Sequence, residues 1–207
     1  MELILDSRRI DVIETSDTPL RKVIERVSDI LKDQNRVISE ILVDGVMIGG
    51  WDDPSIASRN VGECISLRLS SDEPRRIAHR VLYDIADYLP KIQKALVETS
   101  VLLQSRKETE GLELLEKVTA TWAELYHGLQ SAVTVTGLDL NMVSVKGQTF
   151  LQLNHTVHDY LEEVTGLIQD QQFLELSDIL EYEIAPRMPD IQEGIYLFIK
   201  ELEKKTH

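Results

Sequence analysis

The sequence predicts an α+β protein, with a small mixed domain over residues 1–72 and a four-helix bundle over residues 73–207. The first third of the chain holds short apolar stretches that end at turn residues, which is typical of strands, together with one amphipathic helix. The remainder spaces its apolar residues alternately three and four apart over long stretches. Such a seam is typical of helices that pack side by side.

In the first domain, two strands are expected over residues 2–6 and 9–14, joined by a tight turn. A helix follows, and Asp17-Thr18-Pro19 marks its start with a capping side chain and an early proline. Further strands are expected over 37–43, 46–48 and 64–69. Asp44-Gly45 predicts a hairpin, because a type I′ turn needs positive φ. The helix carries one apolar stripe, formed by Leu20, Val23, Ile24, Val27, Ile30 and Leu31.

This order of a hairpin, one helix and returning strands resembles the ubiquitin-like β-grasp fold, over about a third of the chain. The resemblance implies a recognition module, since members of that superfold often act as such modules. Conjugated members end in a free Gly-Gly tail, whereas Gly49-Gly50 is internal here, so conjugation is not expected. Trp51 follows in a loop and is a candidate anchor for a partner, because Trp is enriched in binding hot spots. Packing over the edge of the core is the alternative interpretation.

Four helices are predicted after residue 73. Leu114-Leu115-Glu116 matches Ile179-Leu180-Glu181, 65 positions later, which indicates one helical hairpin used twice. Pro186 and Pro189 are expected to break the seam of the fourth helix and to bend it. The connection over residues 134–147 is expected to cover one end of the core, with a functional loop as the alternative. Three aromatic residues lie on the seams and are expected to be buried, namely Trp122, Phe150 and Phe198.

The chain is acidic, with a formal net charge of −14, and residues 150–207 hold 12 acidic but only 4 basic side chains. Such a surface repels phosphate groups, so neither nucleic acid nor an anionic membrane is expected as a partner. The charge favours a partner with a basic or amphipathic surface, although solubility alone also explains it.

Cys64 is the single cysteine, which excludes an internal disulfide and a four-cysteine zinc site. The first residues lack the basic and apolar regions of a signal peptide, and no apolar run approaches the ~20 residues of a membrane span. A cytoplasmic location is therefore expected. No motif for a cofactor or a phosphate group is found, and no cofactor is expected.

Two helical faces carry candidate metal ligands, because imidazole and carboxylate groups at helical spacing can bind zinc or iron. One unit resembles the Glu-x-x-His half of a di-iron site, but no second unit accompanies it. An exposed polar face is the alternative interpretation. The residues are His155, His158, Asp159 and Glu162 on the third helix, and Glu124 and His127 on the second.

An acidic stretch before Pro186 is the predicted partner-binding site, formed by Glu175, Asp178, Glu181 and Tyr182. An acidic and aromatic helical face suits a basic or amphipathic partner helix, and the proline bend is expected to tilt it outward. A solvated face without a partner is the alternative.

The sequence thus predicts a protein without enzymatic activity that binds another protein, as an adaptor, a regulator or a chaperone. Small acidic helical chaperones of bacterial export systems, including flagellar ones, are similar in size and charge. A second copy of the chain is an alternative partner. A metal-dependent enzyme that uses the histidines and carboxylates of the bundle is the alternative function.

Overall fold

The computed structural model describes residues 1–11, 15–49, 53, 56 and 58–204, so the predicted anchor Trp51 lies outside the described residues. The structure is mixed α+β, as the sequence predicts. The chain divides into two compact units, an N-terminal unit, Met1–Ile77, and a helical unit, Ala78–His207.

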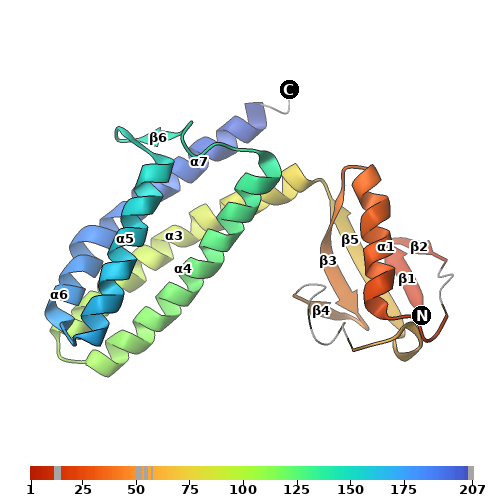
Figure 1. The fold of residues 1–207 in the computed structure, drawn as a ribbon, viewed down its shortest axis with the longest axis horizontal. Helices are drawn as coiled ribbons and strands as arrows, with labels where there is room; N and C mark the ends of the chain where they lie inside the picture. Colours follow the sequence, from red (N-terminus) through yellow and green to blue (C-terminus); the bar gives the residue numbers. More distant parts are fainter. Residues whose placement is uncertain (12–14, 50–52, 54–55, 57, 205–207) are drawn as a thin grey trace. The chain divides into compact units, whose positions relative to one another are not determined.

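The strands of the N-terminal unit form one sheet in the order β2-β1-β5-β3-β4 (Figure 1). The central pair, β1 and β5, is parallel, and the other pairs are antiparallel. Asp44 and Gly45 join β3 to β4 with φ of 53° and 83°, so the predicted hairpin is confirmed. The strands are β1 (Glu2–Leu5), β2 (Arg8–Ile10), β3 (Val37–Val43), β4 (Val46–Ile48) and β5 (Ser66–Asp72).

Helix α1 (Leu20–Asp33) packs its apolar stripe against this sheet (Figure 1). Ile30 was predicted on the stripe but is 58% exposed, because it lies at the stripe's edge. The helix start also differs from the prediction, since the cap residue is Pro19 and no side chain caps it. Instead, the Leu20 N–H donates to the Arg59 carbonyl at 2.9 Å, so a distant strand connection satisfies the helix end.

The helical unit is built from three long helices, a short hairpin and a final helical run that changes geometry along its length. No helix in the described part of the chain is both long and apolar enough to cross a membrane. The elements are α3 (Pro74–Gln104), α4 (Glu108–Thr136), β6 (Ser144–Val145), β7 (Gln148–Thr149), α5 (Phe150–Gln169), α6 (Phe173–Asp178), η2 (Ile179–Ile184), η3 (Ala185–Arg187) and α7 (Met188–Lys204).

One apolar core joins these helices. Phe150 and Phe198 are fully buried, as predicted, and their rings meet edge to face with centroids 4.9 Å apart. Gly194 lies against Phe150 so closely that a Cβ atom at this position would collide with the ring. Trp122, which was also expected to be buried, is only partly buried and packs at the edge of the core.

The connection between α4 and α5 covers part of this core. Its Leu138 and Val143 side chains are buried in the core and Val145 is also buried. Met142, by contrast, is 72% exposed. The burial of these side chains is what the predicted covering role requires.

Candidate functional site

The predicted binding residues lie in the final helical run, which comprises α6, η2, η3 and α7. Its η2 segment, residues 179–184, is a π-helix, and the single 3₁₀ turn of η3 that follows contains Pro186. Proline has no N–H, and its ring displaces the carbonyl of the residue four positions earlier, so regular α-helical bonding cannot pass through it. Such π segments occur frequently at functional sites.

The buried side of the run continues through the proline, so the predicted break in the seam is wrong. An α-helix has 3.6 residues per turn, so buried residues spaced four apart three times in succession would move gradually around the helix and away from the core. The wider π turn absorbs that drift and keeps the buried residues on one side. These residues are Leu176, Leu180, Ile184, Met188, Ile191 and Ile195.

Two partly exposed carboxylates of η2 accept hydrogen bonds from neighbouring helices. Glu181 is half-buried, and its Oε2 accepts hydrogen bonds from the buried Ser100 hydroxyl of α3 at 2.7 Å and from Gln104 at 3.2 Å. Glu183 accepts a 2.7 Å hydrogen bond from the Tyr160 hydroxyl of α5 and pairs with Arg187 at 3.3 Å. The outward position expected for Glu181 is therefore wrong, and both carboxylates hold the run in place.

The hydrogen bond to Glu183 raises the pKa of the Tyr160 phenol, and partial burial of the ring adds to the rise. The guanidinium of Arg187 lies over the Tyr160 ring, 4.9 Å from its centroid. Phenol, carboxylate and guanidinium thus form one connected group between α5 and the π segment.

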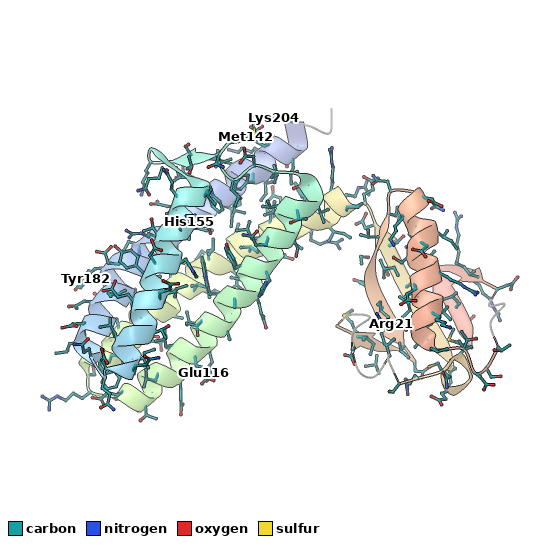
Figure 2. The ribbon with its side chains drawn as sticks, viewed as in Figure 1. Arg21, Glu116, Met142, His155, Tyr182 and Lys204 are labelled. Carbon is teal, nitrogen blue, oxygen red and sulfur yellow. The ribbon has the colours of Figure 1, made fainter. Side chains whose placement is uncertain are left out.

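The opposite side of α6 and η2 carries an exposed face, hereafter the outer face, formed by Leu174, Glu175, Asp178 and Tyr182. Leu174, Asp178 and Tyr182 are spaced four apart, and Tyr182 projects from the outside of the run (Figure 2). Leu174 is 69% exposed and Tyr182 is 62% exposed. Both carboxylates are exposed as well. Two large apolar side chains therefore flank two carboxylates at the surface.

The electrostatics of the outer face are dominated by negative charge. The pKa of the Tyr182 phenol is raised, first by the charge of Glu181, then by a hydrogen bond to it, and also by the charge of Asp178. The neutral phenol therefore persists above its ordinary range. At neutral pH this face offers acceptors and a neutral aromatic ring, which suits a cationic and apolar partner.

The candidate metal ligands do not converge. Within the ranges that the structure describes, no three His, Cys, Asp or Glu side chains come close enough to hold a metal ion. His155, His158 and Glu162 lie exposed on α5, where His158 pairs with Glu162 at 3.4 Å. Asp159 is exposed beside them, and Glu124 and His127 are exposed on α4.

Sequence reasoning did not single out Leu174 or Ser100. Leu174 carried a weak signal, because it stands two positions before the seam residue Leu176 and so falls on the opposite side of the helix. Ser100 carried none, because its partner Glu181 is 81 positions away in the chain.

Comparison with known proteins gives one family. A model described as "Domain of unknown function (DUF8042)" matches residues 80–194, which lie in the helical unit. The chain is also 20% identical over 202 residues to a protein of Treponema pallidum (strain Nichols) described as uncharacterized, a match that covers 94% of this chain and 96% of that protein. No solved structure matches the chain. The relative therefore spans both units, whereas the family model spans the helical one.

Proposed function

The chain belongs to the DUF8042 family, and we propose that it is a protein–protein interaction module that binds a basic, amphipathic helix of another protein on the outer face. One observation carries the proposal. Leu174 and Tyr182, both more than half exposed, stand on one side of a helical run with Glu175 and Asp178 between them. Apolar anchors with charges at their rim are the usual composition of a binding surface.

The chemistry of the partner follows from this face. A suitable partner helix would present an apolar residue on each side of a lysine or arginine. Its apolar residues would then contact Leu174 and Tyr182, and its cation would lie near the carboxylates between them. The surrounding charge supports a cationic partner, because residues 150–207 carry 12 acidic and 4 basic side chains. Charge of this kind raises the association rate at low salt, while the anchors, which become buried when the partner binds, set the dissociation rate.

The fold also supports a recognition role. For the N-terminal unit we propose a ubiquitin-like β-grasp, on the grounds that the first hairpin and a last strand parallel to the first strand share one sheet, against which helix α1 packs. For the helical unit we propose a four-helix bundle, in which the run from α6 to α7 is the fourth helix and all four share one core. An adaptor, a regulator or a chaperone-like protein is compatible with these parts.

We also propose the cytoplasm as the setting. The single cysteine, Cys64, is buried and has a free thiol, and burial raises its pKa. Both properties fit a compartment in which thiols stay reduced.

The proposal is tested by placing a photoreactive phenylalanine analogue at position 182 in the native host. Illumination should give one dominant crosslinked protein, and the crosslinked segment should be a basic amphipathic helix. The matched control places the same analogue at Glu116, an exposed residue of α4 (Figure 2). Equal crosslinking at both positions, or a crosslinked segment that is acidic or unstructured, would contradict the proposal.

A further inference from the structure

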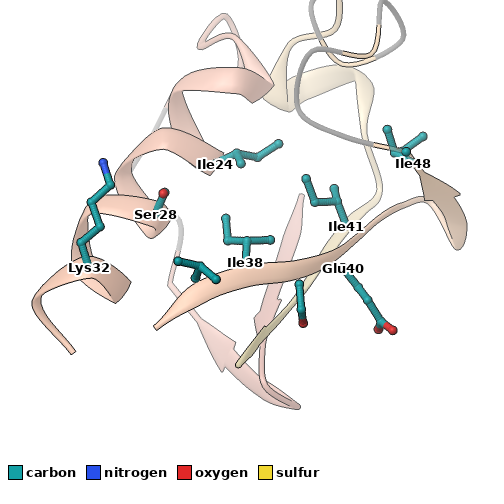
Figure 3. Close-up of a pocket in the computed structure, with 10 residues that line it drawn as sticks. Ile24, Ser28, Lys32, Ile38, Glu40, Ile41 and Ile48 are labelled. Atoms are coloured by element: carbon teal, nitrogen blue, oxygen red, sulfur yellow. The ribbon is translucent and has the colours of Figure 1, made fainter. Parts of the chain in front are cut away.

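A groove lies between α1 and β3 in the N-terminal unit, far along the chain from the outer face. Its volume is about 450 Å³, within the roughly 300–1,000 Å³ that ligand pockets span. Isoleucines from α1, β3 and β4 point into it, while Glu40 points away (Figure 3). The labelled side chains along it are Ile24, Ile38, Ile41 and Ile48, with Ser28 and Lys32 on the α1 side.

Among the described residues, one wall of the groove is an open strand edge. In the part of the chain that the structure describes, β4 pairs only with Ile41, Leu42 and Val43 of β3. The earlier part of β3, Val37–Glu40, pairs with β5 on one side, and no described residue pairs with it on the other. Unpaired backbone N–H and C=O groups at such an edge are a template for a further strand.

We propose that this groove binds an extended segment of another protein by β-strand addition. The segment lies beside Val37–Glu40, in the row that β4 begins, and exchanges backbone hydrogen bonds with β3. Successive side chains of a strand point to opposite faces, so every second side chain of the segment enters the groove beside Ile38. Those side chains are apolar, because isoleucines form the floor of the groove.

An extended segment fits the groove better than a second copy of the chain. Helix α1 lines the other side of the groove, and a second copy would bring its own α1 against this one. The register between β3 and β5 also shifts between Ile38 and Glu40, and irregularities of this kind discourage flat pairing between whole sheets. The proposal is independent of the outer face, because it uses the other unit.

The test begins with a phage-displayed library of random peptides of about ten residues, the length of a long strand, selected on the full-length chain. The strongest peptide should carry apolar residues at every second position. When bound, it should shift the amide resonances of Val37–Glu40. N-methylation at one alternate set of its residues should weaken binding by about tenfold or more, and N-methylation at the other set should leave it unchanged, because only one set faces β3.

Two substitutions locate the site. Ser28→Trp fills the groove from α1 and should weaken the peptide by about tenfold or more, whereas Ile30→Trp, at an exposed position of the same helix, should not. If Ser28→Trp lowers the melting temperature, Ile38→Thr replaces it as a milder change of the floor. Equal effects of both N-methylation sets, shifts confined to other residues, or binding unaffected by both groove variants would overturn the proposal. The same amide shifts on self-association without peptide would assign the edge to a second copy and overturn it as well.

Discussion

The two sides of the final helical run carry the same kinds of residue but use them differently. On the inner side, Glu181 and Glu183 accept hydrogen bonds from Ser100 and Tyr160 of other helices. On the outer side, Glu175 and Asp178 are exposed, next to the exposed Tyr182. Carboxylates that look alike in the sequence therefore divide into a structural pair and a surface pair.

This division changes what a substitution can reveal. Removing an inner carboxylate disturbs the packing of the helical unit, so any loss of binding would be ambiguous. Removing an outer carboxylate leaves the unit intact and reports on the partner alone. Glu181 is therefore a poor reporter of binding, although the sequence places it in the same acidic stretch.

The largest effect is expected from Gly194→Ala, on the inner side of α7. The new methyl group would overlap the ring of Phe150, which is fully buried, so the free energy of unfolding should fall by about 1–3 kcal/mol, as for other overpacked cores. The control is Gly166→Ala on α5, where nothing lies within 4 Å of the added carbon. That variant should gain roughly 0.5–1 kcal/mol from helix propensity. Chemical denaturation measures both, and equal stability of the two variants would contradict the close contact.

A smaller loss is expected from Ser100→Ala, which removes a hydrogen bond to the Glu181 carboxylate. Because Glu181 is half-buried, water replaces part of the lost bond, and the free energy of unfolding should fall by about 1 kcal/mol. In a double-mutant cycle with Glu181→Ala, the two losses should not add, since each substitution removes the same hydrogen bond. Strict additivity would show that the serine and the carboxylate do not interact.

The inner phenol should make stability depend on alkaline pH. The pKa of Tyr160 is raised in the folded protein, so the folded state holds its proton when the unfolded state, with a pKa of about 10, has lost it. This contribution to stability is present in full below about pH 10, and it is lost as the pH rises through the raised pKa of the folded protein. Denaturation from about pH 8 to about pH 11 should show a steeper decline for the wild type than for Tyr160→Phe. If the stability of both proteins declined equally with pH, the Tyr160 phenol would not be the cause of the decline.

The smallest effect on stability is expected from the outer face. Glu175→Gln with Asp178→Asn, and separately Tyr182→Ala, should each change the free energy of unfolding by no more than about 0.5 kcal/mol, because these side chains are exposed. With a purified partner, the charge variant should slow association at low salt only, and Tyr182→Ala should speed dissociation at any salt. A marked fall in stability for either variant would place its residues in the structural group.

Local signals predicted the local structure well. The stripe of α1 and the Asp44-Gly45 hairpin depend on neighbouring residues, and both are present. Pro186 predicted an irregularity in the final run, but not its kind. Whether a proline bends a helix or widens one of its turns depends on how the adjoining helices pack. The pattern of neighbouring residues in the sequence does not contain that information.

The candidate sites were harder to predict for the same reason. Helical spacing places His155, His158 and Glu162 on one face, but only the packed unit determines that this face is exposed. The division between inner and outer carboxylates depends on Ser100 and Tyr160, which lie in other helices. Spacing alone therefore identified the acidic stretch, but it could not tell which carboxylates lie on the inner side and which on the outer side.

The π segment also constrains the length of the chain, but in one direction only. Deleting one residue between Leu180 and Ile184 would shorten that spacing from four residues to three, and the buried residues would then alternate four and three apart, which suits a regular α-helix. Ile195 and Phe198, now fully buried, would stay turned toward the other helices. An inserted residue would instead rotate them by about 100° away from the core. This stretch is therefore expected to tolerate the loss of one residue but not the gain of one.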